Sequence, residues 1–269
     1  MKAIALAIGI ATVVLAAGTP VRADPSSGFA GGYVGVNAGV ARGSSNFGTD
    51  PGCVPVGANG TFCEQSSTSS VNGTHVARSG SGDLSDSGFT GGIQGGYNWQ
   101  SGSIVFGGEA DFGALDLGKS IDRAGVFPFP FLGTTYALGE SMSTDWLVTL
   151  RGKLGYVAAP QLLLYATAGV AFTELDFSSS YSDNAVDVTF PGGAGSGSSS
   201  DVLTGWTVGG GGEWKLDERW SIKAEYLYLD FGSMTVAVPV SNTAAFAQTM
   251  RVDADLDIHL ARIGLNYRY

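Results

Sequence analysis

The sequence predicts an all-β protein: an eight-stranded antiparallel transmembrane β-barrel with long external loops and short periplasmic turns. Three observations support this fold class. Apolar and polar residues alternate with period two in eight segments, which is the period of a β-strand. Long and short connections follow one another in strict alternation, as they do in outer-membrane barrels. All five tryptophans lie on the apolar faces of these segments, near their ends.

Each predicted strand has one apolar and one polar face. In the third strand, Phe106 and Phe112 lie opposite Glu109 and Asp111. Two carboxylates on one face suit a polar lumen better than the core of a soluble β-sandwich. The predicted strands are residues 31–42, 89–99, 104–113, 142–157, 162–172, 202–216, 220–230 and 252–269. The predicted loops include residues 43–88, 173–200 and 231–251, with the glycine- and serine-rich run 192–200 expected to be flexible.

The last strand alternates strictly and ends on an aromatic residue. One of its faces is formed by Ile263, Leu265, Tyr267 and Tyr269. Upstream, the apolar residues occupy even positions instead, at Leu256, Ile258 and Leu260. This change of phase predicts a β-bulge at residues 261–262, which would keep both His259 and Arg262 pointing into the lumen.

The first 23 residues predict a signal peptide, and residues 24–269 a single outer-membrane β-barrel domain. Lys2 supplies a positive charge, and residues 4–17 form an apolar run that is short for a membrane-spanning helix. Without Lys2 and Arg22, the 14 basic residues fall to 12, against 24 acidic residues. This balance argues against nucleic acid as a partner, because nucleic-acid affinity comes from neutralising phosphates.

The tryptophans predict two aromatic girdles, one at each membrane interface. Trp99, Trp214 and Trp220 lie at the strand ends next to the short turns. Trp146 and Trp206 lie at the strand ends next to the long loops.

The polar faces carry charges of both signs, which a barrel would direct into its lumen. One interpretation is a charge-lined selective pore, and the other is a solid core of ion pairs. Eight strands enclose a space that side chains alone can fill, and an unpaired buried charge is costly, so we favour the ion-paired core. The predicted lumen charge network comprises Glu109, Asp111, Arg151, Lys153, Glu213, Lys215, Lys223, Glu225 and Arg262, with Asp145 and Arg268 also expected to face inward.

The two cysteines, Cys53 and Cys63, predict one local disulfide, because an exported chain meets an oxidising environment. A two-thiol metal site is the alternative, but no histidine lies nearby. We expect no cofactor and no metal. The four glycines at 209–212 lie inside a predicted strand with no helix after them, so they lack the context of a phosphate-binding loop.

Several stretches resemble the small eight-stranded outer-membrane β-barrel proteins of the OmpA-like and opacity-protein type, especially the alphaproteobacterial "porin family" surface antigens. These stretches are residues 31–35, 107–113, 151–156, 224–228 and 262–269. The last is similar to the terminal assembly signal of such barrels, with its key positions at Gly264, Tyr267 and Tyr269. The resemblance implies a place in the cell outer membrane of a Gram-negative bacterium and insertion by the barrel-assembly machinery. It also implies contact with outer-membrane lipid and lipopolysaccharide, and loops that bind an external ligand or host receptor.

Three functions follow as hypotheses. We favour a non-catalytic surface protein that supports envelope integrity and interacts through its loops. The alternative is a passive porin-like channel for small solutes. A lipid-modifying enzyme is least favoured. It could use His259 beside Asp257, but its nucleophile could be any of many loop serines, so the motif has little specificity.

Overall fold

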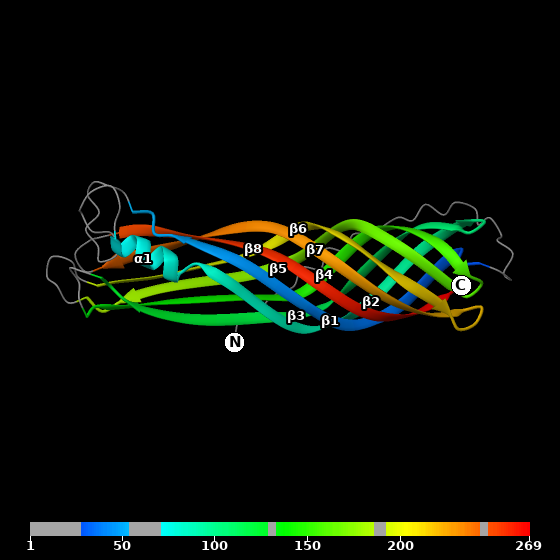
Figure 1. Cartoon of the computed structure of the whole chain (residues 1–269), viewed down its shortest axis with the longest axis horizontal. Coiled ribbons are helices and arrows are strands. Elements are labelled where there is room, and N and C mark those ends of the chain that lie inside the picture. Colours follow the sequence, from blue (N-terminus) through cyan, green and yellow to red (C-terminus); the bar gives the residue numbers. More distant parts are fainter. Residues whose placement is uncertain (1–27, 54–70, 129–132, 186–191, 243–246) are drawn as a thin grey trace, which may run out of the picture.

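The structure, a computed structural model, is a closed barrel of eight antiparallel strands (Figure 1). It describes residues 28–53, 71–128, 133–185, 192–242 and 247–269. Each strand pairs with the next one along the chain, and β8 closes the ring by pairing with β1. The predicted fold class is therefore confirmed. The predicted signal peptide, residues 1–23, lies outside the described residues.

The elements follow one another in simple up-and-down order. The strands are β1 (Gly31–Asp50), β2 (Gly82–Ser101), β3 (Ile104–Val126), β4 (Thr135–Ala159), β5 (Leu162–Asp183), β6 (Gly193–Lys215), β7 (Trp220–Asn242) and β8 (Ala247–Arg268). One helix, α1 (Val71–Ser79), lies between β1 and β2. No helix in the described part of the chain is long and apolar enough to cross a membrane.

The strands are 20 to 25 residues long, about twice the 9–11 residues that a tilted strand needs to cross a bilayer. Much of the sequence predicted as long loops is therefore strand. The prediction of a flexible run at residues 192–200 is wrong, because β6 begins at Gly193 and its serines pair with β5. Figure 1 shows the result, a long narrow barrel with α1 at one end.

The polarity of the barrel inverts along its length, and β8 shows this most clearly. Even-numbered residues of β8 face inward from Val252 to Asn266 without interruption. The inward residues are apolar up to Leu260 and become polar from Arg262 onward. The outward residues of β8 change from polar to apolar at the same point. We call the part of the barrel that contains residues 247–260 of β8 the external half. We call the part that contains residues 261–268 of β8 the membrane half.

The predicted β-bulge at residues 261–262 is wrong. Both pairings of β8 run in continuous register through this point, with Ala261 opposite Val40 on β1 and opposite Tyr226 on β7. The apolar residues change sides because the interior changes from polar to apolar, and the backbone keeps its phase. His259 consequently faces outward and Arg262 faces inward.

True changes of phase occur on β4 and β7. The β4–β5 register shifts between Ser143 and Leu147, so that Thr144 and Leu147 both face inward. Asp145 lies in this irregularity and is exposed, which makes its predicted inward orientation wrong. The β7–β8 register shifts at residues 230–233, where Gly232 has a φ of 67°, a left-handed conformation that glycine adopts at little cost.

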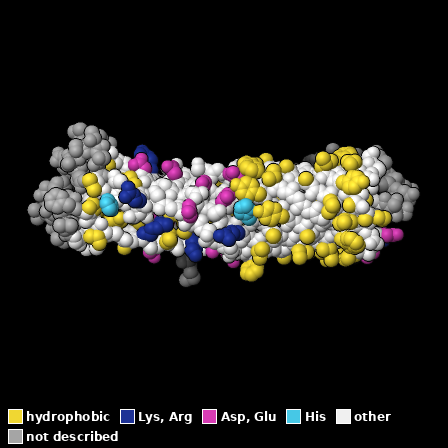
Figure 2. All heavy atoms as spheres, viewed as in Figure 1, with side chains coloured by type: hydrophobic (Ala, Val, Ile, Leu, Met, Phe, Trp, Pro, Cys, Tyr) yellow, Lys and Arg dark blue, Asp and Glu magenta, His cyan; other side chains and the backbone are white. Residues whose placement is uncertain are grey.

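The external half has a hydrophobic core and a polar surface. Its inward side chains form one large buried apolar cluster that includes Phe47, Leu138 and Val238. Val76 of α1 joins this cluster, and Ser79 Oγ lies 2.6 Å from Tyr136 Oη, so α1 packs against that end of the barrel. Figure 2 shows charged side chains over this half and a belt of hydrophobic side chains over the other.

Candidate functional site

The lumen of the membrane half holds a network of charged side chains from β3, β4, β7 and β8. Arg151 on β4 lies at its centre. The Arg151 Nη2 atom lies 2.5 Å from Glu109 Oε1 and 2.8 Å from Asp111 Oδ2, and Nη1 lies 2.9 Å from Glu225 Oε1. The Nε atom donates to Thr149 Oγ1 at 2.9 Å. The planar guanidinium of Arg151, whose N–H donors have fixed directions, thus binds three carboxylates.

Two further cations link walls of the barrel that are not adjacent. Lys223 on β7 reaches β3, with its Nζ 2.7 Å from Glu109 Oε1. Arg262 on β8 also reaches β3, with its Nη1 2.9 Å from Asp111 Oδ1, and its Nη2 lies 2.8 Å from Glu225 Oε2. Because these bonds cross the lumen, they fill the cross-section that eight strands enclose.

Two tyrosines and a lysine extend the network toward the short turns. Tyr33 donates its hydroxyl proton to Glu109 Oε2 at 2.6 Å, and Tyr165 donates to Glu225 Oε1 at 3.0 Å. Lys153 Nζ lies 3.4 Å from Glu109 Oε2 and packs over both tyrosine rings, at 5.0 and 4.6 Å from their centroids. Cation–π contacts of this kind stabilise a desolvated ammonium group.

A smaller group of polar residues follows near the mouth at the short-turn end. Glu213 Oε1 lies 3.0 Å from Arg268 Nη2 and accepts a hydrogen bond from Ser221 at 2.7 Å. Lys215 is not part of the lumen network, because among the described residues it forms no ion pair. It is half-buried, and its Nζ lies 5.1 Å above the ring of Phe29.

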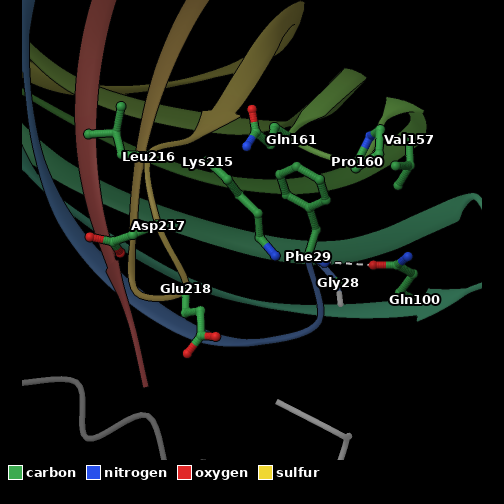
Figure 3. Close-up of a pocket in the computed structure, with 10 residues that line it drawn as sticks. All are labelled: Gly28, Phe29, Gln100, Val157, Pro160, Gln161, Lys215, Leu216, Asp217 and Glu218. Carbon is green, nitrogen blue, oxygen red and sulfur yellow. Dashed lines mark hydrogen bonds between the residues drawn. The ribbon is translucent and has the colours of Figure 1, made fainter. Parts of the chain in front are cut away.

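Phe29 occupies this mouth. Its backbone N–H donates to Gln100 Oε1 at 2.6 Å, and its carbonyl accepts from Asn98 Nδ2 at 3.2 Å. The ring is 1% exposed, and Arg268 lies over it at 5.3 Å. Figure 3 shows Lys215 extending toward the ring, at the edge of an open cavity of about 370 Å³. Phe29 therefore occupies part of this opening, beside the cavity.

The chemistry of this lumen is that of a packed polar core. Every charged residue in the central network has an oppositely charged partner, as buried charges require. Among the described residues, no group of three or more histidine, cysteine or acidic side chains is arranged to hold a metal ion. The arrangement can hold opposite walls together and exclude water.

The predicted girdle residues occupy the outer surface of the membrane half. Trp99, Trp206, Trp214 and Trp220 are 41–50% exposed, as lipid-facing side chains would be. Trp146 is half-buried, and its Nε1 donates to Glu174 Oε2 at 3.3 Å. Trp206 and Trp214 are eight residues apart on β6, which corresponds to a belt about 20 Å tall for a strand tilted by roughly 40°.

The three residues of the predicted assembly signal differ in their surroundings. Gly264 faces inward, where an added Cβ would lie 3.1 Å from Lys223 Cγ, so the lysine stem needs this space. Tyr267 packs edge-on against Trp220 at 5.1 Å. Tyr269 is 79% exposed, and its backbone N–H donates to Gly32 O at 3.2 Å. Their role in assembly stays a prediction.

The predicted disulfide also stays a prediction. Cys53 follows β1 and is half-buried against the external core. Cys63 lies outside the described residues.

His259 does not face the lumen as predicted. It lies on the outer surface, where its Nδ1 atom and the Tyr226 hydroxyl are 2.6 Å apart. Asp257 instead accepts a hydrogen bond from Ser44 Oγ at 2.6 Å. In the described part of the chain, no hydrogen bond joins His259 to a serine or to Asp257, so the geometry of a Ser-His-Asp triad is not formed there.

One ion pair between a buried carboxylate and a half-buried arginine was not anticipated. Glu140 on β4 is buried inside the external half, and its Oε2 lies 3.1 Å from Arg123 Nη1 on β3. Burial, with the nearby Asp122 carboxylate, raises the pKa of Glu140 to about 7, although Arg123 opposes this shift. Both residues lie between the predicted strands 104–113 and 142–157, where no strand was predicted. The alternation of Tyr136, Leu138 and Met142 could have revealed the strand.

The chain is similar to known proteins in three comparisons. The model of the family described as "Outer membrane protein beta-barrel domain" matches residues 9–269. The 31 kDa outer-membrane immunogenic protein of Brucella melitensis is 31% identical over 242 residues, which is 89% of this chain and 83% of the relative. The 22 kDa outer membrane protein of Rhizobium leguminosarum is 32% identical over 146 residues, 54% of each chain. Among solved structures, the outer membrane protein OprG from Pseudomonas aeruginosa matches with a TM-score of 0.46 and 16% identity, covering 89% of this chain and 96% of that one.

Proposed function

Because the chain belongs to the outer membrane protein β-barrel family, we propose that it is a closed, non-catalytic surface protein that supports envelope integrity and interacts through its external half. Its location is the outer membrane of a Gram-negative bacterium. The observation that carries the proposal is the filling of the lumen in both halves of the barrel. Ion pairs fill the membrane half, apolar side chains fill the external half, and Phe29 occupies the mouth beside an open cavity.

A filled barrel favours a structural role over a channel. Lys223 and Arg262 each bridge to β3 across the lumen, so an open path would require several buried ion pairs to break. Breaking one partner of such a pair costs about 3–5 kcal/mol. The passive channel is therefore our second candidate function, and it would need a rearrangement of this network.

The external half is the part of the molecule best suited to meet partners. Its hydrophobic core keeps the strands rigid well beyond the membrane, and its outer surface is polar. We propose that this surface and the connections at its end contact an external ligand or host receptor, and that lipopolysaccharide surrounds its base. Gly264, Tyr267 and Tyr269 would be read by the barrel-assembly machinery during insertion.

Planar-bilayer recording tests the closed state. We expect the wild-type protein to show no stable openings at any salt concentration. The double variant Glu109→Ala/Lys223→Ala removes one bridge across the lumen and should increase conductance, which shows that the assay detects an open lumen. Stable, salt-dependent openings of the wild-type protein would contradict the proposal and support the channel.

An acyl-release assay on lipid vesicles tests the absence of catalysis. We expect no turnover above that of empty vesicles, because among the described residues neither a serine nor Asp257 is hydrogen-bonded to His259, so no Ser-His-Asp triad is formed. Turnover by the wild-type protein that His259→Ala abolishes would instead support a lipid-modifying enzyme.

A further inference from the structure

The lipid-facing surface is hollowed where β1, β6, β7 and β8 meet. The hollow is an open, mostly apolar groove of about 550 Å³. The small residues at its base are Ala38, Gly210, Ala224 and Ala261. Larger outward side chains border it, and these are Val40, Tyr226 and Ile263. These small outward residues leave space at the base of the groove for a chain-like apolar group.

The strand register places a polar row directly beyond the groove. Val40, Ala261 and Tyr226 lie opposite one another across β1, β8 and β7. Two residues further toward the external half, the same strands place Arg42, His259 and Tyr228 in one row. Two residues along a strand correspond to about 7 Å. This row therefore lies at the external end of the groove.

The polar row lies at the depth of a membrane interface. The ring of Tyr228 packs against that of Trp206 at 5.5 Å and against that of His259 at 5.1 Å. Aromatic residues of this kind sit at headgroup level. Figure 2 shows charged side chains beginning at the edge of the hydrophobic belt.

Arg42 and His259 are available to an anion. Both are exposed on the outer surface. Among the described residues, the Arg42 guanidinium forms no ion pair and no hydrogen bond. His259 uses Nδ1 with the Tyr226 hydroxyl at 2.6 Å, which orients the ring and leaves Nε2 open. The N–H donors of an arginine guanidinium and of a neighbouring imidazole can hydrogen-bond to the oxygens of one phosphate group.

We propose that this groove binds a phosphorylated glycolipid of the outer leaflet, the lipid A part of lipopolysaccharide. One acyl chain lies along the small residues, and a phosphate lies on Arg42 and His259. The acidic residues that interact with Tyr228 of this row lie further outward: Asp257 faces Asp230 and accepts a hydrogen bond from Ser44, and Asp255 follows on β8. They confine the phosphate to the membrane side of the arginine. The proposal depends on the membrane location and not on whether the lumen is closed.

Native mass spectrometry of the detergent-folded protein tests this site. The protein is titrated with bisphosphorylated lipid A and, separately, with fully dephosphorylated lipid A. We expect one tightly bound bisphosphorylated lipid per chain. The variant Arg42→Gln/His259→Gln should bind it about tenfold more weakly, as expected for the loss of charge-assisted hydrogen bonds, and should bind the dephosphorylated lipid like wild type. Ala261→Leu, which fills the groove, should weaken the binding of both lipids.

Matched controls separate this site from the rest of the belt. Lys119→Gln removes an exposed charge on β3, and Ala110→Leu enlarges an outward residue on β3, away from the groove. Both controls should bind lipid A like wild type, and every variant must keep the heat-modifiable gel migration of a folded barrel. The proposal is overturned if the groove variants bind lipid like the controls. It is also overturned if Ala261→Leu instead dissociates a dimer of the lipid-free protein, because the occupant is then a second copy of the chain.

Discussion

Arg151 is the residue on which the lumen network depends most, because it contacts three carboxylates at once. Removing it would leave Glu109, Asp111 and Glu225 with fewer positive partners in a site that water does not reach. The ion pairs need not add net stability relative to a well-packed apolar core. Removing only one partner of an ion pair, however, leaves the other charge buried and uncompensated.

We therefore predict that Arg151→Met lowers the free energy of unfolding by about 3–5 kcal/mol. The measurement is equilibrium unfolding by urea in lipid vesicles, followed by tryptophan fluorescence. Arg251→Met is the matched control, because Arg251 is exposed on β8, and its effect should stay within about 0.5 kcal/mol. Equal stabilities of the two variants would show that the network is not the packed core described above.

Glu140 should make the stability of the external half depend on pH. Because its pKa is raised to about 7 in the folded protein, the folded state binds the proton more tightly than the unfolded state does. Its contribution to stability is complete below the ordinary carboxyl pKa and is lost as the pH rises through about 7.

The corresponding prediction compares wild type with Glu140→Gln at pH 4.5 and pH 8. Wild type should lose about 1–3 kcal/mol more stability than the variant over this range, because glutamine has no proton to lose. Urea unfolding measures both proteins, and all other titrating groups cancel in the difference. An identical pH dependence of the two proteins would mean that Glu140 is not buried in the external core.

Among the strands, β7 shows how one strand changes its inward residues between the membrane half and the external half. In the membrane half, Glu225 faces inward and Tyr226 faces outward. Beyond the register shift at residues 230–233, Val236, Val238 and Val240 face inward instead. The external half is therefore held by apolar packing, and its strands should separate if a charge enters that core.

We predict that Val238→Asp opens the external half while the membrane half stays folded. Val238 is fully buried, and an unpaired carboxylate there costs several kcal/mol. Proteinase K added to vesicles should cut the variant in the external half and leave the lipid-embedded strands intact. Ala237→Asp, one residue away and facing outward, should resist cleavage like wild type. Cleavage of both variants to the same extent would contradict the assigned faces of β7.

The membrane-facing parts of the strands were predictable, because lipid outside and charge inside produce strong alternation. The fold class, the strand order and the outward tryptophans follow from that pattern. The external strands were missed because their polar outer faces are rich in serine, glycine and aspartate, which also characterise loops. The period-two signal was present at Met234, Val236, Val238 and Val240, but it has the opposite polarity to a membrane strand.

The same inversion explains the wrong β-bulge on β8. A change of phase in the hydrophobic pattern has two physical causes, an inserted residue or a change of environment, and sequence alone does not distinguish them. On β4 and β7 the register does shift; on β8 it does not. Only the pairing partners, such as Ala261 with Tyr226, separate the two cases.

The whole molecule is one continuous barrel that extends from the lipid of the membrane into water. The membrane half has an apolar exterior and a charged interior, and the external half has the reverse. Side chains fill the interior of both halves, with ion pairs in the membrane half and apolar packing in the external half. The change from an apolar to a polar interior between Leu260 and Arg262 marks the boundary between the two halves.

Spin-label scanning of β8 tests the position of this boundary. Single cysteines are placed at positions 253–267 in a Cys53→Ser/Cys63→Ser background, and the labelled protein is reconstituted in vesicles. A water-soluble nickel complex should reach the labels at 253, 255, 257 and 259, and oxygen dissolved in lipid should reach those at 263, 265 and 267. Labels at the even positions from 254 to 262 should be shielded from both the nickel complex and oxygen. A break in this alternation at 261–262, or access of the nickel complex to the even positions, would contradict the continuous register of β8 and the closed interior of the barrel.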